Sequence, residues 1–108
     1  SRKMRAFFEE RVEGASLNRE EIDKEITRYA ENWEVGRMGA VDRNVLRLAF
    51  FELKFCPDVP PVVALNEAVQ LAKELSSEES GKFVNGILDP AIRTLDRPLR
   101  QGIQKEED

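Results

Sequence analysis

Apolar residues recur at helical spacing along most of the chain, and this pattern constrains its fold more than any other feature. Ile22, Ile26, Tyr29, Ala30 and Trp33, for example, follow one another at steps of four, three, one and three residues. The alternation of apolar and polar residues that is typical of half-buried strands is missing. The pattern therefore predicts an all-α fold, and 108 residues leave room for only one domain.

Glycine, proline and capping residues divide the pattern into five predicted helices. We expect the first helix over about residues 3–13, with Gly14 as its end. Its apolar side chains are Met4, Phe7, Phe8 and Val12. The second helix should begin at Asn18, a favourable N-cap with Glu21 as its capping-box partner, and its apolar stripe reaches Trp33.

The third predicted helix runs from an Asp42 cap to about Cys56 and is apolar around most of its circumference. We therefore expect it to be the central helix of the fold. A fourth helix is expected over about residues 62–75, after a proline-rich connection.

The fifth predicted helix covers about residues 78–95, with Ser76 and Glu79 as its capping box. Pro90 lies four residues after Gly86, where its ring would meet the Gly86 carbonyl. This spacing predicts a kink or an early end of the helix.

The composition removes most catalytic chemistry. The chain has no histidine and one cysteine, which excludes Ser–His and Cys–His catalysis, a disulfide framework and a thiolate zinc cage. Glu67, Gln70 and Glu74 share one side of the fourth helix but lack the histidines of a di-metal bundle site. We therefore predict no metal and no cofactor. Cys56 is expected to be a buried, inert thiol, because a helix C-terminus does not lower its pKa.

One candidate site is a narrow edge of the third helix that carries Arg43, Arg47, Phe50 and Lys54. Guanidinium groups bind phosphates, and an aromatic ring stacks on a base. The alternative is a solvated stripe with a partly covered phenylalanine, and the residue types leave both interpretations open.

A second candidate site lies in residues 80–86, at the start of the fifth helix. Free backbone N–H groups there attract anions, Lys82 adds charge, Phe83 offers a stacking face and Asn85 offers base-edge hydrogen bonds. The alternative is a capped helix start with Phe83 in the core and Gly86 allowing close helix packing.

The net charge of −4 excludes a uniformly basic nucleic-acid binder, so any binding must be local. No run approaches the roughly 18 apolar residues of a membrane span, and no secretory signal is visible. We therefore expect a soluble, cytoplasmic protein that does not engage a membrane. Residues 1–97 are expected to form the single domain, and residues 98–108 a flexible polar tail.

Several stretches resemble the bacterial transcription antitermination factor NusB family in order and spacing. They are VDRNVLRLA (41–49) with EL (52–53), DVP (58–60), NEAVQLAK (66–73) and GKFVNGILD (81–89). Weaker similarity extends the resemblance to about residues 7–95.

The resemblance implies a NusB-like helical bundle without enzyme activity. NusB-like proteins bind the boxA element of leader RNA together with ribosomal protein NusE, and the complex helps RNA polymerase read through terminators on ribosomal RNA operons. The RNA contacts that the resemblance implies are Lys82, Phe83, Glu79, Ser80 and Asn85. Arg43 and Arg47 could serve either RNA binding or structure.

The chain departs from the family pattern at its start. The family normally begins with an arginine-rich helix that contacts RNA, followed by a second helix, whereas this chain resembles the family from the third helix on. We therefore expect an N-terminally truncated protein with about five helices. Loss of cover over the apolar faces of residues 4–33 would favour self-association.

Two other functions stay open. One is an RNA-binding accessory domain related to those fused to ribosomal RNA cytosine methyltransferases, although no glycine-rich cofactor-binding segment follows. The other is a protein-interaction module that does not bind RNA. The salt dependence of the affinity distinguishes a protein-interaction module from an RNA binder, because RNA binding weakens with salt and binding through an apolar protein interface does not.

Overall fold

The computed structural model describes the backbone of residues 2–96 and 98–102, and the side chains of residue 9 and of residues 11–96 and 98–102. These residues form five α-helices and one short 3-10 helix, and none of them lies in a strand. The helices are α1 (Arg2–Leu17), α2 (Arg19–Tyr29), α3 (Ala40–Phe55), α4 (Pro61–Leu75) and α5 (Glu78–Arg93), with the 3-10 helix η1 (Val35–Arg37) before α3. The predicted all-α fold is confirmed.

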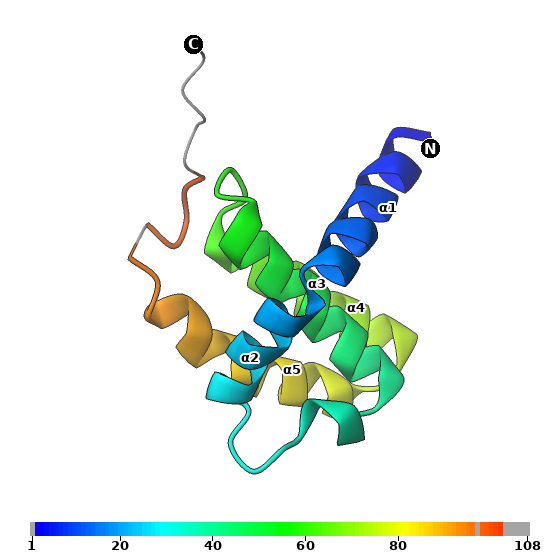
Figure 1. The fold of residues 1–108 in the computed structure, drawn as a ribbon, viewed down its shortest axis with the longest axis vertical. Helices are drawn as coiled ribbons and strands as arrows, with labels where there is room; N and C mark the ends of the chain where they lie inside the picture. The colour runs from blue at the N-terminus through cyan, green and yellow to red at the C-terminus, as the bar shows by residue number, and fades with distance from the viewer. Residues whose placement is uncertain (1, 97, 103–108) are drawn as a thin grey trace.

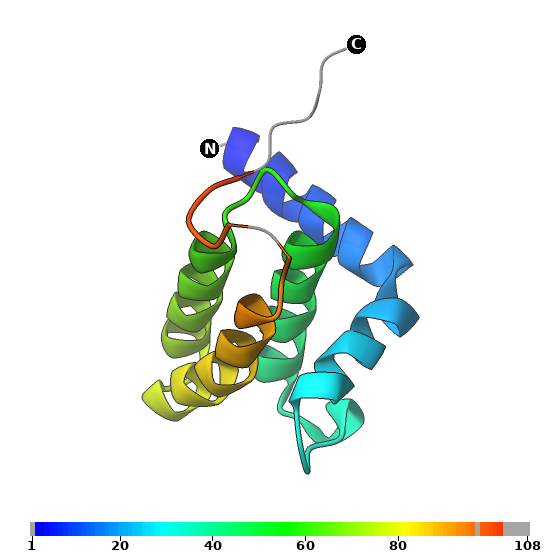
Figure 2. The ribbon, with the colours of Figure 1, turned by 90° about the vertical axis from the view of Figure 1, so that its left-hand side faces the viewer.

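Helix α3 is the centre of the bundle, as its apolar circumference predicts. It packs against all four other α-helices, while α4 and α5 lie side by side along one flank (Figure 2). Helix α1 projects away from the other helices and meets α3 near its own C-terminal end (Figure 1).

Leucine, isoleucine and valine side chains from α2, α3 and α5 fill the centre of the core. Ile22, Ile26, Leu46, Val84 and Leu88 are each 0% exposed. Burial of one such side chain contributes about 1.5–3 kcal/mol to folding, which explains why the helical stripes dominate the fold. The predicted apolar positions Met4, Phe7 and Phe8 lie outside the described side chains.

Gly14 does not end the first helix, as α1 continues to Leu17. A Cβ atom at Gly14 would overlap the Phe51 ring, so this glycine permits a close approach between α1 and α3. The predicted capping box at Asn18 is also wrong, because Asn18 makes no side-chain cap of α2. Its Nδ2 instead donates to the Gly14 carbonyl at 2.9 Å, which closes the end of α1.

The N-caps of α3 and α5 differ from the prediction by a few residues. Gly39 is the N-cap of α3, so Asp42 lies inside the first turn, where its carboxylate interacts favourably with the helix dipole. Ser77 is the N-cap of α5, and its Oγ accepts a hydrogen bond from the Ser80 N–H at 3.1 Å. The predicted Ser76–Glu79 box is therefore replaced by a serine cap one residue later.

Helix α5 passes through Pro90 and ends at Arg93, two residues before the predicted end at 95. Gly86 is exposed, and apart from its chain neighbours and the backbone of α5 itself no atom lies within 4 Å of a Cβ built there, so it does not allow close helix packing. Within the predicted tail, Leu99 packs partly buried against the core, and its carbonyl accepts from the Val62 N–H at 2.9 Å. The start of that tail is thus packed on the domain, and residues 103–108 lie outside the described part.

Candidate nucleic-acid interface

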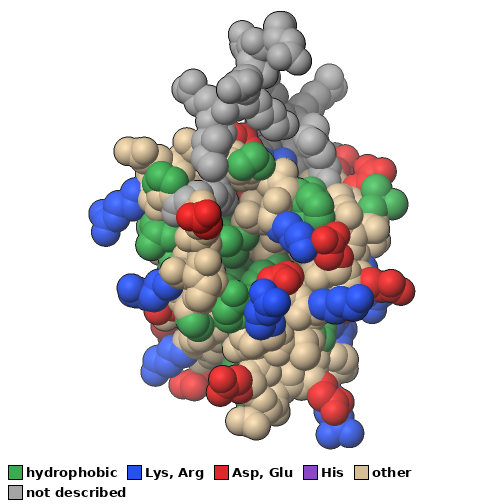
Figure 3. All heavy atoms as spheres, turned by 60° about the vertical axis from the view of Figure 1, so that its left-hand side comes forward, with side chains coloured by type: hydrophobic (Ala, Val, Ile, Leu, Met, Phe, Trp, Pro, Cys, Tyr) green, Lys and Arg blue, Asp and Glu red, His purple; other side chains and the backbone are tan. Residues whose placement is uncertain are grey.

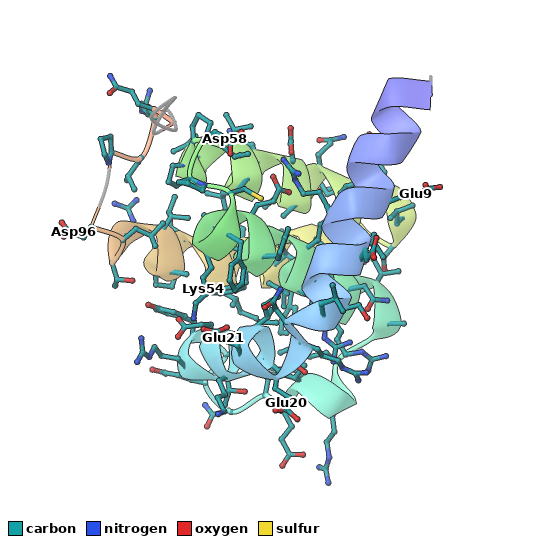
Figure 4. The ribbon with its side chains drawn as sticks, turned by 45° about the horizontal axis from the view of Figure 1, so that its top comes forward. Glu9, Glu20, Glu21, Lys54, Asp58 and Asp96 are labelled. Carbon is teal, nitrogen blue, oxygen red and sulfur yellow. The ribbon has the colours of Figure 1, made fainter. Side chains whose placement is uncertain are left out.

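The predicted basic edge of α3 faces helix α2. Arg47 forms a two-pronged ion pair with Asp23, with 2.9 Å between Nε and Oδ1 and 3.0 Å between Nη2 and Oδ2. Lys54 lies 2.7 Å from Glu21, measured from Nζ to Oε1 (Figure 4). Acidic residues of α2 therefore neutralise the two cations, and we call this contact the α2–α3 seam.

The other two residues of that edge are also engaged within the fold. Phe50 is 5% exposed and stacks on Tyr29 of α2, with 6.0 Å between ring centroids. Nη1 of Arg43 donates to the Met38 carbonyl at 3.3 Å. The edge thus packs α2 onto α3 and does not present a stacking ring to solvent. RNA binding by Arg43 and Arg47 stays a prediction.

The start of α5 divides its predicted site residues between structure and surface. Ser80 is buried: its N–H is held by the Ser77 cap, and its Oγ donates to Oγ of Ser76 at 2.9 Å. Lys82 and Glu79 are 75% and 86% exposed, with 3.9 Å between Nζ and Oε1. Asn85 is exposed as well. The charged and amide groups of this site are therefore accessible, whereas the serine serves as part of the cap.

Phe83 has a partner that the sequence pattern did not reveal. It packs partly buried against the core and meets Trp33 edge to face, with ring centroids 5.2 Å apart and an interplanar angle of 76°. Trp33 was predicted to continue the apolar stripe of the second helix, but α2 ends at Tyr29 and Trp33 is 55% exposed. The local signal was Asn32, a residue type that tolerates the positive φ of 66° found there.

Charges of both signs alternate over the molecular face drawn in Figure 3. Lysine and arginine side chains lie beside aspartate and glutamate, and apolar side chains show between them. This arrangement agrees with the net charge of −4 and favours a small local site over a broad basic surface.

A groove of about 500 Å³ separates the C-terminal part of α1 from α3 and α4. Its lining includes the apolar side chains Val12, Ala15, Val41, Leu48, Leu71 and Leu75. The groove is not lined by any of the residues named at the start of α5. Arg47 of the α2–α3 seam also lines the groove. Self-association through this apolar surface stays a prediction.

One carboxyl group is buried between α3 and α4, in a smaller pocket that shares Leu48 and Leu71 with the groove. Glu52 of α3 is 5% exposed, and its Oε2 has no hydrogen-bond partner among the described residues. The pKa of Glu52 is raised from 4.5 to about 7, chiefly by burial and then by the nearby Glu67 carboxylate. Arg11 of α1 opposes part of this increase, and Asp58 adds a smaller one. Glu52 therefore changes its charge near neutral pH.

Other polar groups form ordinary helix contacts. Nε2 of Gln70 donates to Oε1 of Glu74 at 2.9 Å along the surface of α4. Within the described part of the chain, no three histidine, cysteine, aspartate or glutamate side chains gather closely enough to hold a metal ion. Cys56 is buried at the C-terminal cap of α3, as predicted.

The fold and its surface define an all-α bundle with an exposed lysine beside an aromatic pair. The model of the NusB family matches residues 1–93, and the chain belongs to that family. It is 51% identical over 92 residues to the transcription antitermination protein NusB of Myxococcus xanthus, covering 85% of this chain and 66% of that protein. The NusB of Desulfitobacterium hafniense is 45% identical to this chain over 96 residues, covering 89% of this chain and 65% of that protein.

Two solved structures share the fold. T. maritima NusB superposes with a TM-score of 0.77 at 44% identity, over 87% of this chain and 66% of that one. A chain in a crystal structure described as a plectonemic RNA supercoil superposes with a TM-score of 0.72 at 36% identity, over 79% of this chain and 62% of that one. This chain thus spans slightly less than two thirds of the length of these relatives. No helix among the described residues is long and apolar enough to cross a membrane.

Proposed function

We propose that this chain is an RNA-binding transcription antitermination factor. In this proposal it acts in the bacterial cytoplasm, binds the boxA RNA of ribosomal RNA operons with ribosomal protein NusE, and works within the antitermination complex of RNA polymerase. The family match over residues 1–93 supports the general role. The observation that carries the RNA-binding proposal is the exposed Lys82 beside the Trp33–Phe83 pair at the start of α5.

The side chains at this position supply three kinds of RNA contact. The Lys82 ammonium pairs with a backbone phosphate, the Phe83 ring offers apolar contact to an unstacked base, and the Asn85 amide hydrogen-bonds to a base edge. Glu79, beside Lys82, restrains non-specific attraction to phosphate. Ser80 acts indirectly, because its side chain completes the cap that fixes the start of α5.

The net charge makes the partner protein important. A chain with a charge of −4 gains little from non-specific attraction to RNA, so a small local site must supply the selectivity. NusE would then add contact surface to the same RNA and raise its affinity. Arg43 and Arg47 have a smaller part in this proposal, since Arg47 is already paired with Asp23.

Titration of fluorescently labelled boxA RNA tests the proposal. The chain would be titrated with and without NusE at two salt concentrations, with a scrambled RNA of equal length. We expect selective, salt-sensitive binding that tightens with NusE. Lys82→Ala should weaken it several-fold and reduce the dependence of log K on log salt by about one, because one phosphate contact is lost.

Lys24→Ala is the matched control, because Lys24 is an exposed lysine on a different helix, α2. It should leave the selective affinity unchanged. Equal binding of boxA and scrambled RNA, or equal losses in the Lys82 and Lys24 variants, would contradict the proposal. Binding to NusE alone, without RNA selectivity, would favour a protein-interaction module.

A further inference from the structure

We infer that Trp33 is a base-stacking residue that Phe83 holds in place, so that the two rings form a platform for one unpaired base of the RNA. This inference rests on the proposed function and extends its site from α5 to the segment between α2 and η1. The two rings come from positions 50 residues apart in the sequence, and the fold places their centroids 5.2 Å from each other.

The backbone after α2 turns so that Trp33 leaves the helical stripe. The Ala30 N–H bonds to the Ile26 carbonyl at 2.8 Å, and the Trp33 N–H bonds to the Ala30 carbonyl at 3.1 Å. Between them, Asn32 has a φ of 66°, which asparagine adopts more readily than most residues. This turn ends the helix and brings the indole ring against Phe83 instead of into the core.

The ring geometry favours Trp33 as the stacking surface. The interplanar angle of 76° is an edge-to-face arrangement, so the two rings cannot enclose a base in parallel between them. Phe83 is partly buried against the core and is held there, whereas Trp33 is 55% exposed. A base can therefore stack on Trp33, while contact with Phe83 limits the motion of the indole before RNA arrives.

The charge beside the platform favours RNA over an apolar partner. Lys82 directly precedes Phe83 on α5 and is 75% exposed, so a phosphate of the stacked nucleotide or its neighbour has a cation within reach. Stacking on an aromatic side chain requires an unpaired base, because bases in a duplex are already stacked. The occupant is therefore single-stranded RNA.

Trp33 is the only tryptophan of the chain, so its fluorescence reports this position alone. The full chain would be titrated with single-stranded boxA RNA while tryptophan emission and the anisotropy of labelled RNA are recorded in parallel. We expect quenching that follows the same binding curve as the anisotropy. Trp33→Leu should lower the affinity roughly tenfold, and Trp33→Tyr should retain most of it, because stacking needs a ring.

Phe55→Leu provides the matched control, since Phe55 is a partly exposed aromatic residue that stacks on Phe51 at the C-terminal end of α3. It should leave the affinity for RNA unchanged. Circular dichroism melting curves of all variants would identify a loss of RNA affinity that comes from unfolding. If Trp33→Leu melts at a lower temperature, the RNA affinity of Trp33→Tyr is compared with that of the wild type at equal melting temperature.

The outcomes separate this inference from the proposed function. If labelled boxA RNA does not bind the wild-type chain, both are overturned. If the RNA binds but tryptophan emission stays constant and Trp33→Leu binds normally, only the stacking role is overturned. If Trp33→Leu weakens NusE binding and leaves RNA binding intact, Trp33 belongs to a protein interface and the inference is wrong.

Discussion

The α2–α3 seam and the start of α5 both carry the residue types of an RNA site, yet the fold uses them differently. In the seam, Arg47 and Lys54 face Asp23 and Glu21 across the helix contact. At the start of α5, Lys82 projects into solvent and has only a long contact of 3.9 Å with Glu79 on its own helix. A cation that a neighbouring helix neutralises holds the fold together, whereas a solvent-facing cation is available to a ligand.

The aromatic rings of the two regions differ in the same way. Phe50 is buried in the seam against Tyr29, and the Trp33 ring is more than half exposed beside Phe83. Burial of Phe50 contributes to stability but removes its faces from a base. We therefore expect substitutions in the seam to affect unfolding, and substitutions at the start of α5 to affect RNA binding.

Arg47→Ala should have the largest effect on stability. The Arg47 side chain is 14% exposed, and its removal leaves the Asp23 carboxylate partly buried without its two-pronged partner. We expect a loss of about 3 kcal/mol in the free energy of unfolding, because two charge-assisted hydrogen bonds to a part-buried carboxylate are lost, each worth about 1.5–3 kcal/mol. Urea denaturation measures this loss, and the affinity of the folded variant for boxA RNA should stay within a factor of two or so.

Arg28→Ala is the control for Arg47→Ala, because Arg28 lies 3.8 Å from Glu25 at the surface of α2 and is 68% exposed. An exposed pair of this kind contributes about 0–1 kcal/mol. Unchanged stability of Arg47→Ala together with a large loss of RNA affinity would overturn the contrast between the two regions and assign Arg47 to the RNA site.

Glu52→Gln tests a charge that is buried without full pairing. The pKa of Glu52 is raised from 4.5 to about 7, so between these values the folded state binds more protons than the unfolded state. The stabilisation by protonated Glu52 is therefore complete below pH 4.5 and is lost as the pH rises through 7. Glutamine resembles the protonated form, so the variant should exceed the wild type in stability by up to about 3 kcal/mol at pH 8.

Denaturation of both proteins at pH 4.5, 6 and 8 measures this difference, which should shrink toward zero at the lowest pH. Glu74→Gln is an exposed control on α4. A Glu52→Gln variant less stable than the wild type at pH 8 would contradict this expectation. It would show that Arg11 stabilises the ionised Glu52 carboxylate as effectively as Arg47 stabilises Asp23.

The sequence pattern was sufficient for features that depend on neighbours along the chain. The apolar circumference of residues 42–56 predicted the central position of α3, and prolines placed the start of α4 within one residue. Lys82 was predicted to lie at the start of the fifth helix, and the structure places it there with its side chain exposed.

Features that depend on contacts between distant segments were not predictable in this way. Nothing near Arg47 indicates that Asp23, on another helix, would take both guanidinium nitrogens. Helical spacing also assigned Trp33 to the core, because periodicity does not register the left-handed turn at Asn32 that ends the stripe. Only half of the proposed stacking site could therefore be predicted: Phe83 was named from its own stretch of sequence, but its partner Trp33 was not.

Two glycine substitutions extend the comparison to the backbone, with the smallest expected effects. Inside a helix, alanine stabilises the folded state by about 1 kcal/mol relative to glycine. At Gly14 the added Cβ would overlap the Phe51 ring, and overpacking costs about 1–3 kcal/mol, so Gly14→Ala should lower stability by about 1 kcal/mol. At Gly86 no atom other than its chain neighbours and the backbone of α5 itself lies within 4 Å of the added Cβ, so Gly86→Ala should raise stability by up to about 1 kcal/mol.

Urea denaturation of both variants measures these opposite changes in the free energy of unfolding. RNA titration of Gly86→Ala then shows how far the proposed RNA site extends along α5. Gly86 follows Asn85 on the exposed side of α5, so a methyl group there changes the surface beside the proposed RNA site without touching the core. Unchanged affinity would confine the RNA to the first turns of α5 and the Trp33 ring. A clear loss of affinity in a more stable protein would mean that the RNA continues along α5 past Asn85, since no loss of folding could account for it.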